Sequence, residues 1–232
     1  MKNLVELFEK YGINLSEKQE NQFDIFFNFL ISENEKYNLT AITEENEVLV
    51  KHFLDSVLPY KEIPQNAKVI DIGTGAGFPG VPLKILRPDI KLTLVDSLQK
   101  RVNFLQSLLS MLEINDVKTV HSRAEDYVKT NRETFDIALS RAVAQIPTLS
   151  EYLLPYVKVG GKVLMYKGSN FEDEINQGKR AISTLGGKLD RVLQFKIEEI
   201  DIFRAIVIIK KQNSTNPLYP RGKNLPKTKP IL

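Results

Sequence analysis

The stretch Val69-Ile-Asp-Ile-Gly-Thr-Gly-Ala-Gly-Phe-Pro-Gly80 decides the fold. A short apolar run of the β-forming type leads into a turn dense in glycine, and a helical pattern follows. Glycine has no Cβ, so Gly73, Gly75 and Gly77 let the backbone adopt positive φ and approach a ligand closely. The stretch therefore predicts a strand, a ligand-binding turn and a helix in succession.

From Lys68 onward, short β-rich runs alternate with helical stretches, which is typical of βαβ units and a mostly parallel sheet. Only Lys196 to Arg204 separate the last two runs, too few residues for a helical crossover, so these strands should form an antiparallel hairpin. We predict seven strands, over residues 69–72, 92–95, 117–120, 135–139, 162–166, 189–195 and 205–209.

The chain before residue 60 reads as helices. Apolar residues keep a 3.6-residue rhythm up to Gly12, Ser16 and Gln19 form a capping-box pattern, and a third helix is predicted over 44–58. Residues 213–232 carry four prolines and no periodicity, which predicts an extended tail. We expect a helical region over 1–60, a Rossmann-like domain over 61–212 and a basic, proline-rich tail over 213–232.

Composition excludes several kinds of protein. The 232 residues include no cysteine, which rules out disulfides, thiolate metal sites and cysteine nucleophiles. No apolar run approaches the roughly 20 residues that cross a bilayer, so we expect a soluble, cytoplasmic protein. The net charge is only +3. The basic excess lies in the tail, which has no acidic residue and contains Arg221, Lys223, Lys227 and Lys229.

Two acidic residues help to choose the ligand of the glycine turn. Gly75, Gly77 and Gly80 also satisfy G-x-G-x-x-G, so a nicotinamide dinucleotide is one alternative. Asp71 at the end of the first strand would repel a pyrophosphate, whereas the ammonium group of S-adenosylmethionine needs such a partner. Asp96, at the end of the next strand, would accept hydrogen bonds from the ribose of either cofactor. Asp71 therefore favours S-adenosylmethionine.

The next two strand ends complete the predicted crevice. The third strand precedes Ser122-Arg-Ala-Glu125, which places Ala124 and Glu125 at the adenine edge, and the fourth ends in Ser140-Arg-Ala142. The ends of parallel strands meet in the crevice where open α/β sheets bind ligands. The predicted fold class is α/β: a class I S-adenosylmethionine-dependent methyltransferase with a Rossmann-like seven-stranded sheet, an antiparallel edge hairpin and a small N-terminal helical extension. A tight turn flanked by solvated acidic residues is the alternative for each position taken singly.

Several further motifs are spread over nearly the full length of the chain. Together with the glycine turn they are Asn38-Leu-Thr-Ala-Ile42, Lys51-His-Phe-Leu-Asp-Ser56, Asp71-Ile-Gly-Thr-Gly-Ala-Gly-Phe-Pro-Gly80, Asp96-Ser-Leu-Gln-Lys-Arg101, Ser140-Arg-Ala142, Lys167-Gly168 and Tyr219-Pro-Arg221. In these motifs the chain resembles the RsmG (GidB) family of ribosomal RNA small subunit methyltransferases. The resemblance implies that Gly73, Phe78, Ala124, Glu125 and Arg141 line the S-adenosylmethionine site. It also implies that the product is N7-methylguanosine in a conserved loop of 16S rRNA.

Methylation at guanine N7 suits the residues present. Methylation at C5 of a pyrimidine commonly uses a cysteine, which is absent. The turn Ser140-Arg-Ala-Val143 lacks the Asn/Asp-Pro-Pro-aromatic pattern of many adenine amine methyltransferases. Guanine N7 carries an in-plane lone pair and no proton, so its attack needs alignment and charge management but no general base.

Basic residues supply the candidate contacts to RNA. Arg141 is the first candidate for a catalytic role, as a hydrogen-bond donor to guanine O6. His52 is interpreted as a helix-face or interface residue, and no metal site is predicted. The candidate RNA-binding residues are Lys100, Arg101, Arg123, Lys167, Tyr219 and Arg221. For Lys100 and Arg101 a solvated first turn of a helix is an equal alternative, and for the tail a merely disordered end.

The expected partner is 16S ribosomal RNA or the small ribosomal subunit, with no membrane and no metal, and we expect a monomer. Two rival functions remain open. One is a small-molecule methyltransferase of the same fold, with the N-terminal helices as a lid. The other is a non-catalytic nucleotide-binding protein.

Overall fold

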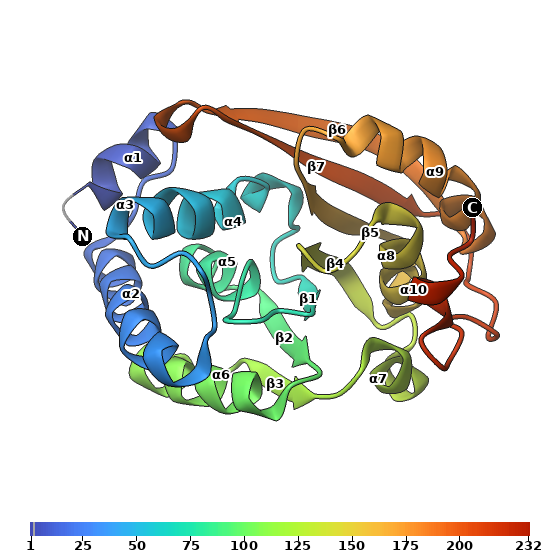
Figure 1. The fold of residues 1–232 in the computed structure, drawn as a ribbon, viewed down its shortest axis with the longest axis horizontal. Coiled ribbons are helices and arrows are strands. Elements are labelled where there is room, and N and C mark those ends of the chain that lie inside the picture. Colours follow the sequence, from blue (N-terminus) through green and yellow to red (C-terminus); the bar gives the residue numbers. More distant parts are fainter. Residues whose placement is uncertain (2) are drawn as a thin grey trace.

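The seven predicted strands form one sheet in the computed structural model, which describes residue 1 and residues 3–232. The sheet order is β3-β2-β1-β4-β5-β7-β6 (Figure 1). β1 pairs in parallel with both β2 and β4, which places the glycine turn at the centre of the sheet. The strands are β1 (Lys68–Ile72), β2 (Lys91–Asp96), β3 (Lys118–His121), β4 (Phe135–Arg141), β5 (Val157–Lys167), β6 (Gly187–Ile197) and β7 (Ile202–Lys211).

The predicted antiparallel edge hairpin is confirmed. β7 pairs antiparallel with both β5 and β6, and Ile197 lies opposite Ile202 where the hairpin closes. β5 is longer than predicted, because it continues through Gly160 and Gly161, which a sequence pattern marks as a turn. The register of β4 against β5 shifts between Phe135 and Ile137, and this irregularity accommodates the additional residues.

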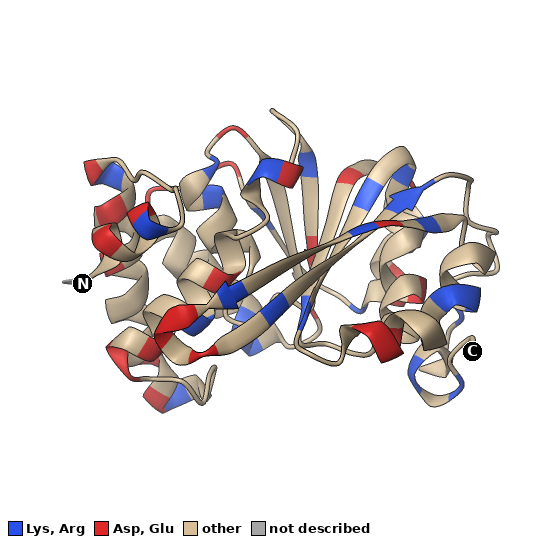
Figure 2. Ribbon diagram, turned by 90° about the horizontal axis from the view of Figure 1, so that it is seen from above, with Lys and Arg blue, Asp and Glu red and all other residues tan. Residues whose placement is uncertain are grey.

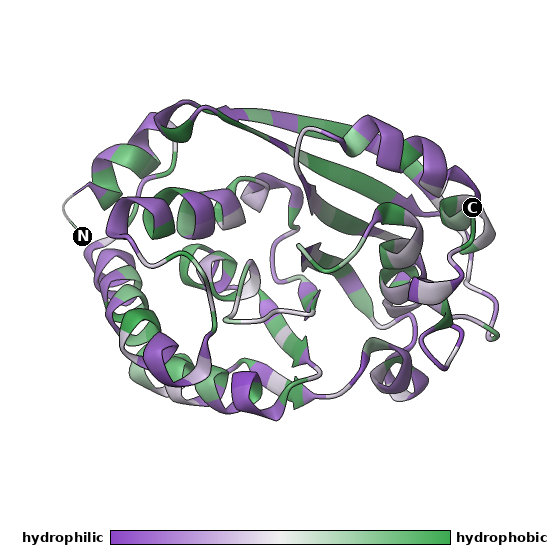
Figure 3. Cartoon of the chain, in the orientation of Figure 1, coloured by the Kyte–Doolittle hydropathy of each residue, from purple (hydrophilic) through white to green (hydrophobic). Residues whose placement is uncertain are grey.

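Helices cover both faces of the sheet, and each face has its own hydrophobic core. Side chains alternate along the strands, so Val69 belongs to the first core and its neighbour Ile70 to the second. Figure 3 shows hydrophobic residues concentrated along the central strands, whereas the helices carry both hydrophobic and hydrophilic residues. The helices between the strands are α5 (Gly80–Leu86), α6 (Gln99–Met111), α7 (Ala124–Asn131), α8 (Ile146–Leu153) and α9 (Phe171–Thr184).

The N-terminal helices α1 (Leu4–Lys10) and α2 (Glu17–Tyr37) pack against the first core. The predicted capping box at Ser16 is present. The predicted third helix is also present, as α3 (Glu45–Val48), a π-helical segment Leu49–Leu54 and α4 (Asp55–Val57). Phe8, Phe23, Phe26 and Phe53 are fully buried in the core that also holds Val69 of β1. The predicted boundary near residue 60 therefore does not coincide with a break in the core.

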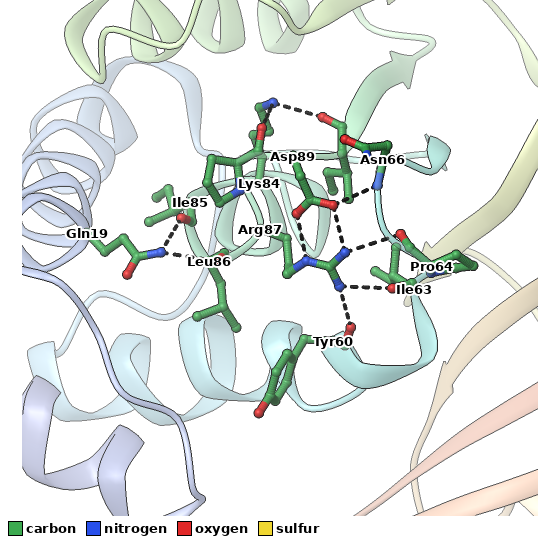
Figure 4. Close-up of polar contacts among 12 residues, drawn as sticks. Gln19, Tyr60, Ile63, Pro64, Asn66, Lys84, Ile85, Leu86, Arg87 and Asp89 are labelled. Carbon is green, nitrogen blue, oxygen red and sulfur yellow. Dashed lines mark hydrogen bonds and ion pairs between the residues drawn. The ribbon is translucent and has the colours of Figure 1, made fainter.

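Polar contacts also attach the N-terminal helices to the sheet domain (Figure 4). The amide of Gln19 donates to the last two carbonyls of α5, at 2.9 and 3.2 Å. The guanidinium of Arg87 donates to the carbonyls of Tyr60 and Ile63 and pairs with Asp89. The bonds from Gln19 satisfy carbonyls that the end of α5 leaves without partners within the helix.

The prediction of an extended tail over 213–232 is wrong. The segment contains a short helix, α10 (Leu225–Thr228), which packs against α8. Its chain end lies beside α9 (Figure 1), where Nη1 of Arg180 donates to Leu232 at 3.2 Å. Arg221 forms an ion pair with the fully buried Glu151, and the Thr148 hydroxyl donates to the carbonyl of the buried Pro226 at 2.8 Å. Such anchors are single contacts with distant residues, so they leave no periodic pattern in the sequence.

Lys, Arg, Asp and Glu are interspersed over most of the helices and strands (Figure 2). In the described part of the chain, no helix has both the length and the apolar character that a membrane span requires.

Candidate active site

Three adjoining cavities lie near the carboxyl ends of the parallel strands, where open α/β sheets bind ligands. The β2–β3 cavity, of about 190 Å³, lies beside Asp96 and Ala124. The glycine-loop cavity, of about 570 Å³, shares Gly73 and Asp96 with it. The β5–β7 cavity, of about 440 Å³, shares His52, Arg141 and Ala142 with the glycine-loop cavity. Cavity residues therefore run without interruption from the end of β3 to the end of β5.

The glycine turn adopts the backbone conformation that its sequence predicts. Gly73, Gly75 and Gly77 have φ values of 72°, 61° and 95°, in the left-handed region that favours glycine. A Cβ on Gly73 would also lie 2.5 Å from Cγ2 of Val143. The amide of Gly75 donates to Oδ2 of Asp96 at 2.9 Å, so the acidic residue at the end of β2 holds the turn.

The structure corrects the predicted position of Asp71. Its carboxylate is fully buried beneath the glycine turn and lines none of the three cavities. Oδ2 accepts hydrogen bonds from the Thr74 hydroxyl at 2.8 Å and the Gly80 amide at 2.9 Å, which draws the carboxylate under the turn. Oδ1 has no hydrogen-bond partner among the described residues. Burial raises the pKa of Asp71 to about 7.

The other seven predicted cofactor residues line the β2–β3 cavity or the glycine-loop cavity. Asp96 lines both, and its Oδ1 accepts from the Leu98 amide at 2.9 Å. Each carboxylate oxygen has about two acceptor sites, so capacity remains for a ligand. The seven are Gly73, Gly75, Phe78, Asp96, Ala124, Glu125 and Arg141.

Arg141, the predicted catalytic residue, is held by the helical segment in front of it. Its Nη1 donates to Oδ2 of Asp55 at 2.7 Å and to the Lys51 carbonyl at 3.1 Å. Its Nη2 lies 3.2 Å from Nδ1 of His52, and its guanidinium lies over the Phe78 ring at 5.1 Å. Most of its donors are therefore committed to protein groups, whereas the sequence predicts a donor free for the substrate. Its Nε has no hydrogen-bond partner among the described residues.

His52 is a neutral member of this cluster. Arginine can only donate, so Nδ1 of His52 accepts, and Nε2 carries the hydrogen that it donates to the Thr40 hydroxyl at 2.9 Å. Burial and the nearby Arg141 charge lower the pKa of His52 to about 3. The ring stacks on Phe78 at 4.5 Å. His52, predicted to lie on a helix face or at an interface, therefore forms part of the wall between the glycine-loop cavity and the β5–β7 cavity.

The predicted RNA-binding residues after β2 and β3 lie at or near the cavity rim. Lys100 is exposed and donates to the Tyr37 carbonyl at 2.9 Å. Arg101 lines the glycine-loop cavity, and its Nη1 lies 3.4 Å from Oδ2 of Asp96. Arg123 is exposed at the β2–β3 cavity.

The remaining three predicted RNA-binding residues are engaged by other groups of the protein, and a contact with RNA stays a prediction for each of them. Lys167 is 8% exposed, forms an ion pair with Glu174 and lines the β5–β7 cavity. The Arg221 guanidinium is bound to Glu151, at 2.9 Å from Nε to Oε1 and 2.7 Å from Nη2 to Oε2. Tyr219 packs against the second core, and its carbonyl accepts a hydrogen bond from Arg132. Residues of the tail that were predicted to contact RNA therefore bind the tail to the rest of the protein.

The cavities include residues that the sequence does not single out as site residues. Thr40 and Lys227 line the glycine-loop cavity, and Asn224 lines the β2–β3 cavity. Thr40 belongs to the Asn38-Leu-Thr-Ala-Ile42 motif, and Lys227 is one of the basic residues of the tail. Asn224 carries no signal in the sequence. The described residues contain no group of three or more His, Asp or Glu side chains that could hold a metal ion.

A comparison with protein families finds one whose model matches residues 19–203: GidB, rRNA small subunit methyltransferase G. Curated relatives match over nearly the whole length. A ribosomal RNA small subunit methyltransferase G of Clostridium novyi is 45% identical over 228 residues, which cover 97% of this chain and 94% of the relative. A protein of the same name from Lactobacillus acidophilus is 46% identical, over 96% of this chain and 95% of the relative.

Solved structures share the fold at low sequence identity. An rRNA methylase from Streptococcus thermophilus superposes with a TM-score of 0.51 at 17% identity, covering 69% of this chain and 95% of that one. M. jannaschii TYW2 in complex with AdoMet gives a TM-score of 0.54 at 15% identity, covering 68% and 76%. The predicted class I S-adenosylmethionine-dependent methyltransferase fold is confirmed.

Proposed function

Because this chain belongs to the family of rRNA small subunit methyltransferases G, we propose that it methylates N7 of a guanosine in 16S ribosomal RNA. The methyl donor is S-adenosylmethionine, and the chain is an rRNA methyltransferase. The observation that supports the proposal best is the series of adjoining cavities. The β2–β3 and glycine-loop cavities suit the cofactor, and the β5–β7 cavity lies beyond the wall at His52, Arg141 and Ala142 that it shares with the glycine-loop cavity.

The acidic groups of the crevice fit a cationic cofactor. Asp96 and Glu125 line the β2–β3 cavity, and Asp96 also lines the glycine-loop cavity. These groups favour a ligand with an ammonium group and disfavour a pyrophosphate. We assign Asp96 to the ribose, Ala124 and Glu125 to the adenine edge, and the glycine turn to the amino-acid part. S-adenosylmethionine, when bound, supplies a methyl group on a positively charged sulfur.

The residues around the proposed methyl-transfer position align groups without taking a proton. Both ring nitrogens of His52 already have hydrogen-bond partners, and its low pKa keeps the ring neutral at pH 7. Guanine N7 has no proton to lose, so the absence of an available base suits this acceptor. Arg141 retains its Nε hydrogen for guanine O6 while Asp55 fixes the rest of its guanidinium.

Transfer of tritiated methyl groups from S-adenosylmethionine tests the proposal. We expect the label to appear in small-subunit ribosomal RNA. In cells without this protein, 16S rRNA should lack one N7-methylguanosine, which mass mapping of its modified nucleotides would detect. Label that enters only small metabolites would instead support a small-molecule methyltransferase. Binding of NAD without binding of S-adenosylhomocysteine would support the non-catalytic alternative.

We propose in addition that the chain acts as a monomer and meets its ribosomal substrate in the cytoplasm. Light scattering of the protein with S-adenosylhomocysteine should give the mass of one chain, 26.5 kDa. A mass of twice that value would contradict the monomer.

A further inference from the structure

Among the predicted cofactor residues, Arg141 alone lines the β5–β7 cavity, in the wall that this cavity shares with the glycine-loop cavity. Lys167 and Gly168 contribute from the end of β5, Glu174 from the first turn of α9, and Arg204 from β7. Glu174 and Arg204 do not line the glycine-loop cavity, so they lie beyond Arg141 from the cofactor side. The cavity volume of about 440 Å³ accommodates a purine ring.

Glu174 and Arg204 in this cavity can form further hydrogen bonds that no described residue of the protein uses. Oε2 of Glu174 is held by Nζ of Lys167 at 2.6 Å and by the Ile146 amide at 3.0 Å. Oε1 of Glu174 has no hydrogen-bond partner among the described residues, and a carboxylate oxygen can accept two hydrogen bonds. Arg204 uses only Nε, which donates to Oδ1 of Asp55 at 3.0 Å. Its terminal nitrogens have no partner in the described chain.

We propose that the β5–β7 cavity binds the guanine ring of the substrate, and that Glu174 and Arg204 distinguish guanine from adenine. This inference rests on the proposed function. Oε1 of Glu174 accepts hydrogen bonds from N1–H and the N2 amino group, and the terminal nitrogens of Arg204 donate to O6. N7 lies next to O6, on the far side from N1–H, and then faces the wall at Arg141 and Ala142, where the Nε hydrogen of Arg141 reaches the second lone pair of O6.

The hydrogen-bonding pattern explains the choice of base. Guanine presents two neighbouring donors, N1–H and N2–H, beside the O6 acceptor. Adenine presents an N1 lone pair and an N6 donor, so a carboxylate would face a lone pair and the guanidinium would face a donor. Glu174 and Arg204 are partly buried, and a bound adenine would exclude water from both while leaving them without partners, which disfavours adenine. A base in this cavity must leave its stack, as bases do in other enzymes that modify them.

Replacement of the target guanosine by inosine tests the proposal on the unmodified protein. Inosine keeps N7, O6 and N1–H but lacks the N2 amino group. The substrate is a small-subunit RNA or particle whose methylated guanosine has been mapped. We expect kcat/KM to fall by about tenfold or more with inosine, the effect of one lost hydrogen bond to a charged group. Equal rates on guanosine and inosine would overturn the proposal.

Two variants and one control link the effect to this cavity. Glu174→Gln should lower kcat/KM for the guanosine substrate and reduce the preference for guanosine over inosine. Gly168→Leu should block transfer by filling the cavity, because a Cβ there meets no heavy atom within 4 Å. Glu172→Gln, on the exposed side of the same helical turn, is the matched control and should behave as the parent.

Cofactor binding separates a local effect from misfolding. S-adenosylhomocysteine should bind Gly168→Leu and Glu174→Gln with parental affinity in calorimetry. Unchanged kcat/KM in both variants, with parental cofactor affinity, would show that the base binds elsewhere although the chain methylates RNA. Absence of any transfer to ribosomal RNA by the parent would instead refute the proposed function itself, so the two failures are distinguishable.

Discussion

Gly75 and Gly12 share a backbone conformation but differ in what they face. Their φ values are 61° and 70°, and a Cβ added to either meets no heavy atom within 4 Å. Of these two glycines, Gly75 lines the glycine-loop cavity and Gly12 does not. Alanine in the left-handed region costs about 1–2 kcal/mol, so both Gly75→Ala and Gly12→Ala should lower the free energy of unfolding by similar amounts.

Binding of S-adenosylhomocysteine separates these two variants. Gly75→Ala should weaken binding by about tenfold or more, equivalent to about 1.4 kcal/mol, because its methyl group enters the cavity. Gly12→Ala should bind with parental affinity. Calorimetry and thermal melting of both proteins check the pair. Parental affinity in Gly75→Ala would mean that the cofactor does not approach this turn.

Asp71 makes stability depend on pH in an unusual direction for an acidic residue. Burial raises its folded pKa from an ordinary value of 3.8 to about 7. Between these values the folded state holds a proton that the unfolded state releases, so stability falls as pH rises through this window. Below about pH 4 the contribution is fully present.

Asp71→Asn tests this dependence. The amide oxygen can accept from Thr74 and Gly80 as Oδ2 does, so the fold should survive. Relative to the parent, the variant should gain stability as pH rises from 4 to 7, by up to about 1.4 kcal/mol per pH unit. Denaturant unfolding at several pH values measures the difference. A pH-independent difference would show that Asp71 keeps an ordinary pKa in the folded state.

At the scale of elements, local patterns were predictable and long-range contacts were not. The capping box at Ser16 and the glycine turn depend on neighbours in sequence, and a single chain reveals them. The motif containing His52 and Asp55 was visible, but its contact with Arg141 depends on how the π-helical segment packs against β4. No spacing in the sequence encodes that packing. The position of Arg221 was mistaken for the same reason, because its partner Glu151 is distant in sequence. Asp71 differs, because its partners Thr74 and Gly80 belong to the same glycine turn.

The link between the tail and α8 offers a test at this scale. Arg221 is the ion-pair partner of Glu151, whose side chain is fully buried. Removing one partner of a buried ion pair costs about 3–5 kcal/mol, because the other charge stays buried without compensation. Arg221→Met should therefore lower the free energy of unfolding several times as much as Lys229→Met does. The side chain of Lys229 is exposed and makes no ion pair among the described residues.

Hydrogen exchange locates the effect of Arg221→Met. Amides of residues 213–232 should exchange faster, and S-adenosylhomocysteine should bind more weakly, because Asn224 and Lys227 of this segment line the cofactor cavities. Unchanged exchange in the tail would mean that other contacts, such as that between Thr148 and Pro226, suffice to hold it.

At the scale of the whole molecule, the seven strands and the antiparallel edge hairpin followed from the alternation of β-rich and helical runs, whereas the order of the strands in the sheet comes from the structure. The predicted division into regions does not match the hydrophobic core. The sequence changes character near residue 60, where helical patterns give way to βαβ units. The first hydrophobic core crosses that point and includes both Phe23 of α2 and Leu94 of β2. Whether residues 61–212 fold as an independent domain therefore stays a prediction, and the packing argues against it.

A fragment of residues 61–232 tests the division. Without the N-terminal helices, the face of α5 and α6 that packs on α2 loses its cover, and Phe78 loses its partners Phe26 and His52. Arg141 also loses Asp55, so a charge that is 12% exposed in the full chain lacks its partner. Apolar surface of this extent promotes association, so we expect an aggregating fragment without cooperative melting, whereas the full chain melts in one transition. A soluble fragment that melts cooperatively and binds S-adenosylhomocysteine would show that the helices are an appendage. In that case the contacts of His52 and Asp55 would be dispensable for the cofactor site and needed only where the RNA binds.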